Sequence, residues 1–244
     1  MAVVTGAARG IGAATVVALR ARGVEVVAAD VDELALKESA AASGATAFHC
    51  DVRDASHAEE LVDFAQRTHG RVDLVIANAG IGHAGDFASM PADRLVDMLD
   101  INVRAPMLLT RAALPGMVDR GLGSVVLVTS IAGSLLVTRE SAYSAGKAAL
   151  EALAVPLREE LRGTGVTVST VVPSVVPTAF WDGRGEAYTR RWPRPVTAER
   201  VAQAVVAAVE NDRRQVVVPP WLRLPMHIHR LTPGLYRILS RRFG

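Results

Sequence analysis

Short apolar stretches that alternate with helical patterns constrain this fold most strongly. Four of them, residues 2–5, 24–29, 46–50 and 72–77, run directly into Gly6, Asp30, Asp51 and Asn78. Apolar runs of this length predict buried strands, and right-handed crossovers between them give a parallel sheet with helices on both faces. The pattern continues with predicted strands at 124–129, 166–172 and 215–218 and with helices at 92–118, 140–162 and 198–211. We therefore predict a single-domain, doubly wound α/β fold.

The glycine turn after the first strand indicates a phosphate site. Gly6, Gly10 and Gly12 separate the strand from a helical pattern over residues 13–22, with Ile11 inside the turn. Glycine lets the backbone approach a pyrophosphate closely, and the helix N-terminus offers free N–H groups. The spacing differs from G-x-G-x-x-G, so a glycine turn without a ligand remains the alternative. In such Rossmann-type sheets ligands bind at the carboxyl ends of the strands, where the four strand-end residues gather.

Asp30 favours NAD over NADP. It follows the second strand, where a carboxylate would accept hydrogen bonds from the adenosine ribose and repel a 2′-phosphate. Arg9, inside the glycine turn, is the opposing feature, because a guanidinium there would suit a 2′-phosphate. No basic residue follows Asp30 directly, so we expect NAD, with NADP less favoured. The structural alternative for Asp30 is a carboxylate that caps the next turn.

Tyr143 and Lys147 form the candidate catalytic pair. They lie four residues apart in a segment rich in Ala and Leu, and a helix would project both side chains from one face. A phenol titrates near pH 10 (about 10), and we expect the ammonium beside it to lower that pKa toward working pH. Most such pairs are ordinary surface neighbours, but this chain holds only two lysines and three tyrosines. The pair is a candidate general acid or base.

Two further polar residues lie where chemistry is expected. Ser130 follows the strand at 124–129 and so lies at the active edge of the sheet. Asn102 lies among apolar residues of the helix at 92–118, which we expect to be interrupted near Asn102 and Pro106. A buried Asn needs partners for its amide, and local repair of the helix ahead of the proline is the alternative role.

Taken together, the motifs resemble those of the short-chain dehydrogenase/reductase family over residues 2–219. They occur in the family's order: Thr5-Gly6-x-x-x-Gly10-x-Gly12, Asn78-Ala79-Gly80, Asn102, Ser130 and Tyr143-x-x-x-Lys147. The resemblance implies a seven-stranded doubly wound sheet, a nicotinamide cofactor, and assembly as a homodimer or homotetramer. Two departures are Ala77, where the family usually has Asn, and Ser174, where it usually has Gly after Pro173. The third is Pro156, which falls inside the helix of Tyr143 and Lys147 and should kink it.

The resemblance also implies roles for single residues. Residues near the adenine and the nicotinamide would be Asp51, Val52, Pro173, Val176 and Thr178, while Asn78, Ala79 and Gly80 would line the cofactor. Lys147 would bind the nicotinamide ribose, and Asn102 would hold a water that links Lys147 to solvent. The expected enzyme moves a hydride between the nicotinamide and a secondary alcohol or ketone, with Tyr143 moving the proton and Ser130 orienting the substrate oxygen. No metal is expected.

Two other functions were weighed against this one. A sugar epimerase or dehydratase of the same superfamily has a different glycine spacing and a further substrate domain. A non-enzymatic protein that senses nicotinamide redox state would use the same fold. Intact Ser130, Tyr143 and Lys147 argue against the sensor.

The substrate walls are predicted to be mostly apolar. Segments 81–90, 131–141 and 174–195 contribute Leu135, Leu136, Val137, Phe180, Trp181, Tyr188 and Trp192, while Arg184, Arg190 and Arg191 would stay in water at a lid. The pattern indicates a lipophilic alcohol or ketone. The alternative is that the lid residues pack as ordinary core.

The end of the chain is basic and amphipathic. We place a catalytic domain at residues 1–219, with its substrate loop at 174–195, and a tail at 220–244. After Asp212 there are seven arginines and no acidic residue, interleaved with large apolar side chains. Such a tail would lie on an anionic membrane or an acidic carrier, or else pack across a subunit interface.

Composition excludes several function classes. A net charge of +2 is too slight to predict nucleic-acid binding, and no apolar run is long enough to cross a bilayer. The N-terminus lacks the pattern of a secretory signal, and a lone Cys50 excludes an internal disulfide, so we expect a cytoplasmic protein with Cys50 as a buried, inert thiol.

Overall fold

A computed structural model of the chain describes residues 1–181, 183–185 and 193–234. Its centre is a sheet of seven parallel strands in the order β3-β2-β1-β4-β5-β6-β7. The strands are β1 (Ala2–Thr5), β2 (Val26–Asp30), β3 (Thr46–His49), β4 (Leu74–Ala77), β5 (Gly123–Val128), β6 (Val166–Pro173) and β7 (Gln215–Val218). The predicted doubly wound α/β fold is confirmed, with strand ends that differ from the prediction by one or two residues.

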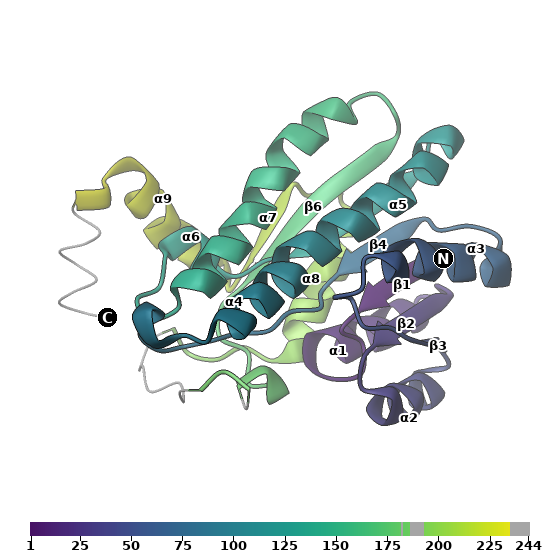
Figure 1. The fold of residues 1–244 in the computed structure, drawn as a ribbon. Coiled ribbons are helices and arrows are strands. Elements are labelled where there is room, and N and C mark those ends of the chain that lie inside the picture. Colours follow the sequence, from purple (N-terminus) through teal and green to yellow (C-terminus); the bar gives the residue numbers. More distant parts are fainter. Residues whose placement is uncertain (182, 186–192, 235–244) are drawn as a thin grey trace.

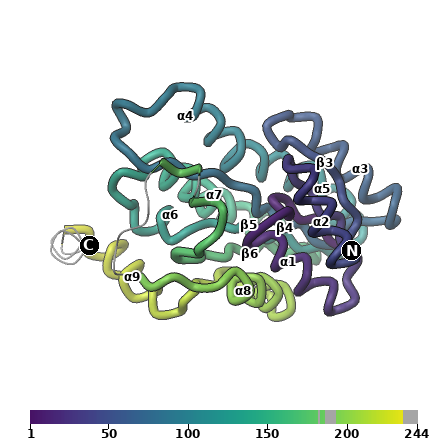
Figure 2. Tube along the Cα trace, turned by 90° about the horizontal axis from the view of Figure 1, so that it is seen from below, coloured from purple at the N-terminus to yellow at the C-terminus, as the bar shows by residue number. Residues whose placement is uncertain are grey.

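Helices cover both faces of the sheet (Figure 1). One face carries α1 (Gly10–Arg20), α2 (Glu33–Ser43) and α8 (Ala198–Glu210), and Figure 2 shows α1 and α8 lying side by side. The other carries α3 (Ser56–His69), α5 (Ala105–Arg120) and α7 (Ser141–Glu160). Side chains of a strand alternate between the two faces. Val4 therefore packs in the first of these cores and Val3 in the second.

The long helix predicted at 92–118 is interrupted, as expected. It consists of α4 (Ala92–Leu99), a π-helical turn (Asp100–Arg104) and α5, which has Pro106 at its start. The π-helical turn carries Asn102, whose side chain is buried. Pro115 and Pro156 lie inside α5 and α7, which continue past them to Arg120 and Glu160.

Two helices were not predicted from the sequence. The first, α6 (Ile131–Leu135), follows Ser130 and packs against α7. The second, α9 (Arg223–Leu231), lies beside α6 at one end of the molecule (Figure 1). Leu222 and Met226 anchor this end of the chain against Ile131 and Leu135. The division into a domain at 1–219 and a tail stays a prediction. Three short 3₁₀ turns complete the described elements: Phe87–Ser89, Ala179–Trp181 and Pro220–Leu222.

Candidate active site

A cavity of about 400 Å³ opens at the carboxyl ends of the strands. Most of the predicted site residues line it: Gly6, Arg9, Gly10, Ile11, Asp30, Asn78, Ala79, Gly80, Ser130, Tyr143, Lys147, Pro173, Val176 and Thr178. Gly12, Asp51, Val52 and Asn102 do not. The parallel sheet thus brings residues more than 170 positions apart to one edge, as expected for a doubly wound fold.

Close backbone packing holds the glycine turn. A Cβ on Gly12 would lie 1.9 Å from the carbonyl oxygen of Gly6, so only glycine fits there. The Asn78 side chain donates to the carbonyl oxygens of Thr5 and Gly6, at 3.0 and 3.1 Å. The Asn78 side chain therefore ties the glycine turn to the end of β4, and Asn78 also lines the cavity.

Asp30 has two structural partners as well as a place in the cavity wall. Its Oδ2 accepts from the N–H of Ala8 at 2.9 Å, and its Oδ1 accepts from the N–H of Asp32 at 3.0 Å. The second bond is the turn-capping role that we had kept as the alternative. The half-buried carboxylate still borders the cavity, so its predicted contact with the ribose stays a prediction.

The Arg9 guanidinium is already paired. Its Nη2 lies 2.7 Å from Oδ2 of Asp32, and the two side chains are 59% and 36% exposed. Asp32 also caps α2 by accepting from the N–H of Ala35. Arg9 is therefore held by a neighbouring carboxylate at the edge of the cavity.

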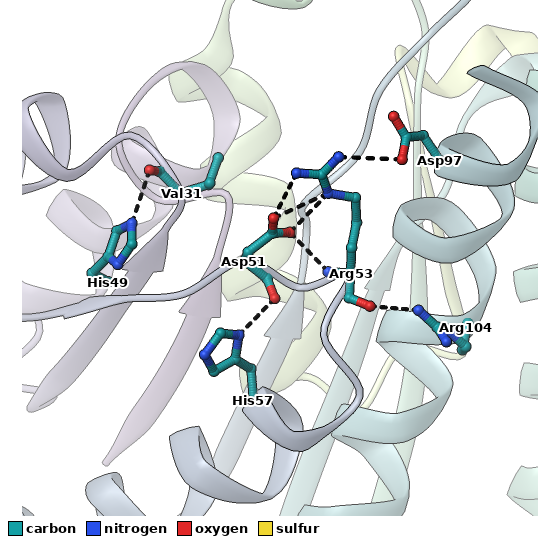
Figure 3. Close-up of polar contacts among 7 residues, drawn as sticks. All are labelled: Val31, His49, Asp51, Arg53, His57, Asp97 and Arg104. Carbon is teal, nitrogen blue, oxygen red and sulfur yellow. Dashed lines mark hydrogen bonds and ion pairs between the residues drawn. The ribbon is translucent and has the colours of Figure 1, made fainter. Parts of the chain in front are cut away.

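Asp51 lies outside the cavity because an arginine holds its carboxylate (Figure 3). Arg53 donates to both Asp51 oxygens, with Nη2 at 2.6 Å from Oδ2, and reaches Asp97 with Nη1 at 3.2 Å. This pairing lowers the pKa of Asp51. Neighbouring Val52 lines a separate small pocket near Cys50. In this structure both residues stand apart from the main cavity, because the turn after β3 directs them toward Arg53 and α3; their predicted adenine contact stays a prediction.

Asn102 supports the loop after β4. Its Oδ1 accepts from the N–H of Ile81 at 3.1 Å, and its Nδ2 donates to the Ile81 carbonyl at 2.8 Å. Local repair of its own helix is therefore not the role of this amide. A Cβ on Gly80 would lie 2.9 Å from Asn102 Oδ1 and 3.3 Å from Lys147 Nζ, so both side chains lie close to Gly80.

Tyr143, Lys147 and Ser130 converge on one wall of the cavity. Tyr143 and Lys147 come from the first two turns of α7, and Lys147 Nζ lies 5.9 Å from the centre of the Tyr143 ring. Lys147 also donates to the carbonyl oxygen of Val128 at 2.9 Å. Ser130 caps α6, where its Oγ accepts from the N–H of Ala132 at 3.1 Å. All three side chains are buried.

Burial, rather than Lys147, dominates the proton affinity of Tyr143. Burial raises the pKa of Tyr143 to about 12, and a hydrogen bond with the Ser130 hydroxyl opposes that rise. The predicted lowering of this pKa is therefore wrong for the protein alone. Loss of water destabilises the phenolate by more than the neighbouring groups stabilise it. Burial also lowers the pKa of Lys147 to about 8. Tyr143 is consequently a neutral phenol at pH 7.

Gly133 is a site residue that sequence reasoning missed. A Cβ there would lie 2.7 Å from the carbonyl carbon of Lys147 and 2.8 Å from the nitrogen of Ala148. Backbone atoms cannot move aside, so glycine at this position lets α6 approach α7 and keeps Ser130 near Tyr143. The only available signal was a glycine three residues after Ser130, which is too common to indicate a role.

The substrate wall is partly as predicted. Val137, Phe180 and Trp181 line the cavity, and the Phe180 ring packs 5.4 Å from that of Tyr143. Leu136 faces solvent instead, and Leu135 packs toward α9. Arg184, expected in water, is buried against Glu140 and Trp181. The predictions for Tyr188, Arg190, Arg191 and Trp192 lie outside the described residues.

Comparison with known proteins agrees with this geometry. The family model described as short chain dehydrogenase matches residues 1–189. This chain belongs to the short-chain dehydrogenase family. It is an oxidoreductase of that family, and the predicted resemblance is confirmed.

Individual relatives cover most of the chain. A ketoacyl reductase, HetN, of Nostoc sp. is 36% identical over 219 residues, which are 88% of this chain and 76% of that protein. A probable oxidoreductase, EphD, of Mycobacterium tuberculosis is 34% identical over 98% of this chain, which spans only 44% of that longer protein. Among solved structures, a short-chain dehydrogenase/reductase of Burkholderia phymatum in complex with NAD has a TM-score of 0.87 at 27% identity, covering 96% of this chain and 94% of that one. A Sphingobium yanoikuyae short-chain dehydrogenase in complex with NADPH has a TM-score of 0.82 at 25% identity, covering 96% and 95%.

A short-chain dehydrogenase of this kind needs a dinucleotide site, and the cavity fits one. Ser174 lines the cavity, is buried, and its Oγ has no hydrogen-bond partner, so the cavity wall carries an unused polar group. Its N–H donates to the carbonyl oxygen of Val218, which fixes the path of the loop after β6 despite the departure from Gly. Among the described residues, no group of three or more His, Cys, Asp or Glu side chains is arranged to hold a metal ion.

Proposed function

We propose that this enzyme transfers a hydride between NAD and a secondary alcohol or ketone, with a lipophilic substrate. The observation that carries the proposal is the convergence of Tyr143, Lys147 and Ser130 on a cavity that also borders the glycine turn. The name of the Nostoc relative, a ketoacyl reductase, supports a carbonyl substrate. The apolar wall of Val137, Phe180 and Trp181 supports a lipophilic one.

Each residue of the site has a separate role in the proposed reaction. Tyr143 gives a proton to the substrate oxygen in reduction and, as phenolate, takes it back in oxidation. Ser130 donates a hydrogen bond to the same oxygen and holds it near the phenol. Lys147, protonated at pH 7 with a pKa of about 8, would hold the nicotinamide ribose of a bound cofactor and adds positive charge beside Tyr143. Asn102 fixes Ile81 and so shapes the wall opposite α7. The nicotinamide, when bound, supplies or accepts the hydride at its ring.

The charge states favour reduction at neutral pH. Because the pKa of Tyr143 is raised to about 12, the phenol already carries the proton that reduction requires. Oxidation needs the phenolate, so its rate should rise with pH through the alkaline range, while reduction loses activity only as Tyr143 ionises. The experiment that tests the proposed function is therefore turnover in both directions, against pH, on a series of ketones and alcohols of increasing chain length. Absence of turnover with NAD still bound would instead favour a redox sensor, which no comparison supports.

The cofactor proposal is NAD, for two reasons. Asp30 borders the cavity where a ribose hydroxyl would be recognised, and Arg9 is occupied by Asp32. The Burkholderia structure holds NAD and the Sphingobium structure holds NADPH, so the fold accepts either. The preference of this chain for NAD therefore depends on Asp30 and Arg9.

An Asp32→Asn variant tests this cofactor choice. Asn still caps α2, so the fold should persist, but it no longer neutralises Arg9. We expect the NADP-to-NAD affinity ratio to rise several-fold, by about the strength of one exposed ion pair. Thermal shifts with each nucleotide would measure it. Glu33→Gln, which breaks an exposed pair with Lys37 on the same helix, is the matched control and should leave the ratio unchanged.

We propose that α9 meets an anionic lipid surface. Trp221, Leu224 and Leu231 fall on one outward-facing stripe and are 51%, 67% and 79% exposed, whereas Leu222 and Met226 face the body of the protein. Arg223, His227 and Arg230 border that stripe. A second copy would bring an equally basic helix against this one, which like-charge repulsion disfavours. No helix of the described residues has the length and apolar character to cross a membrane, so the contact proposed is peripheral.

Replacing both stripe leucines should release the protein from anionic lipid. We expect Leu224→Gln/Leu231→Gln to lower co-sedimentation with phosphatidylserine-containing vesicles at least tenfold, because two exposed apolar side chains no longer enter the interface. Neutral phosphatidylcholine vesicles, and a Leu34→Gln variant that removes an exposed leucine on distant α2, are the controls. Unchanged lipid binding together with a lower oligomeric mass would instead assign the stripe to a subunit interface.

Assembly and location stay predictions. The homodimer or homotetramer implied by the family would use an apolar groove between α5 and α7, which is lined by Met107, Leu114, Val118, Leu153 and Leu157. The cytoplasmic location rests on the lone Cys50, which is buried and has its pKa raised to about 12. That finding agrees with an inert thiol.

A further inference from the structure

A buried ion pair links the substrate loop to the catalytic helix. Arg184 Nη2 lies 2.7 Å from Oε1 of Glu140, and the two side chains are only 8% and 14% exposed. Glu140 directly precedes α7, three residues before Tyr143, whereas Arg184 belongs to the loop that follows β6. The neighbouring ion pair of Arg139 with Asp86 is far more exposed to solvent.

A series of side-chain contacts connects Arg184 in the substrate loop with Tyr143. The Arg184 guanidinium stacks 4.4 Å from the centre of the Trp181 ring. Trp181 packs edge-on against Phe180, and Phe180 packs against Tyr143. Trp181 also donates from Nε1 to the carbonyl oxygen of Val176, which borders the cofactor side of the cavity. The pair therefore fixes the aromatic wall that faces the reacting oxygen.

The charges of this pair are buried with few partners. Nε and Nη1 of Arg184 are buried without hydrogen-bond partners, so one guanidinium is held in a dry site by a single carboxylate bond. Burying charges in this way costs stability, and a hydrophobic pair of equal volume would pack at least as well. Tyr143 packs in a hydrophobic cluster with apolar residues from α4, α6 and the loop after β4. Charged groups in the described part of the site include Lys147 on α7, Glu140, Arg184 and the cavity-lining Arg94, which donates to the carbonyl oxygens of Gly82 and Gly183.

We propose that Glu140 and Arg184 are a positioning pair, which seats the substrate loop on α7 and balances two opposite charges around the Tyr143 hydroxyl. The inference rests on the proposed proton transfer by Tyr143. The anion favours the neutral phenol and the cation favours the phenolate, and the pKa of Tyr143 responds to each in that sense. Because they act in opposite directions, the two charges of the intact pair partly offset each other at the phenol.

Neutralising each partner in turn tests the pair. Glu140→Gln leaves the cation alone, so the ionisation constant of Tyr143 should increase by up to about tenfold, the lower end of the effect of a nearby opposite charge. Arg184→Met leaves the anion alone and should decrease it by a similar factor. The double variant should return near wild type. A general loosening of the structure would move both single variants the same way, so opposite signs are the diagnostic result.

Two readouts keep this test separate from the proposed function. The chain has three tyrosines, so ¹³C NMR of protein labelled at tyrosine Cζ reports the titration of Tyr143 without turnover, with assignment from Tyr143→Phe. The pH dependence of kcat/KM for ketone reduction should shift in parallel. Opposite NMR shifts in a protein whose Tyr143→Phe variant remains active would support the pair and reject the mechanism.

Controls guard against misfolding. Arg139→Met breaks the neighbouring exposed pair and should leave the Tyr143 titration unchanged. Arg184→Lys keeps the charge and should stay close to wild type. If Arg184→Met does not fold, Glu140→Gln and Arg184→Lys still decide the sign. Shifts of the same sign in both neutral variants, or no shift in Glu140→Gln, would overturn the proposal.

Discussion

Tyr143→Phe should lower kcat for ketone reduction by about a thousandfold or more, within the range of general acid–base catalysis. The change removes one oxygen atom and keeps the ring that packs against Phe180. The Ser130 hydroxyl alone would then face the substrate oxygen, and Ser130 is also engaged with the N–H of Ala132. Steady-state turnover with saturating NADH measures the loss.

The cofactor site offers the control for that variant. Nucleotide affinity should change little, because Lys147 keeps its bond to the Val128 carbonyl and the glycine turn is untouched. A thermal shift with NADH equal to that of wild type would show that the site persists. Near-normal turnover by Tyr143→Phe would mean that another group moves the proton, and the proposed mechanism would fall.

Gly12→Ala should abolish nucleotide binding. The added methyl group would lie 1.9 Å from the Gly6 oxygen and 2.8 Å from Asn78 Nδ2, so the turn and α1 must separate. Overpacking of this kind typically costs about 1–3 kcal/mol of folding free energy, and here it also displaces the N–H groups that would bind a pyrophosphate. Chemical denaturation would measure the first effect and NADH fluorescence titration the second.

Gly234→Ala is the matched comparison for this substitution. A Cβ at Gly234 meets no atom within 4 Å, and its backbone does not require the left-handed region. Stability and nucleotide affinity should both remain at the wild-type level. If Gly12→Ala bound NADH as tightly as Gly234→Ala does, the cavity would not be the nucleotide site.

Local sequence determined the sheet and most of the cavity wall. Apolar runs that end in Gly6, Asp30 and Asn78 predicted strand ends, and a parallel sheet necessarily gathers its carboxyl ends at one edge. Helical spacing predicted that Tyr143 and Lys147 share a face of α7, which the structure bears out. These features depend on periodicity and on the geometry of neighbouring residues, so a single sequence is enough to read them.

The contacts that the sequence did not indicate share a different cause. Asp51 pairs with Arg53 of the following turn, and Arg53 also donates to Asp97 on α4; nothing at position 51 itself indicates that pairing. Arg184 looked like a solvated lid residue because its buried partner, Glu140, lies 44 residues earlier. Gly133 looked ordinary because its function depends on the backbone of Lys147 across a helix interface.

Charge in the site was likewise decided by the tertiary structure. The sequence placed an amine four residues after a phenol and so predicted an easier ionisation. Burial acts on both groups at once, raising the pKa of Tyr143 and lowering that of Lys147. The sequence by itself thus determined which groups meet and at which edge of the sheet. Only the folded chain decided how much water they lose and which distant charges stand beside them, because desolvation and long-range pairing depend on every element that packs around the site.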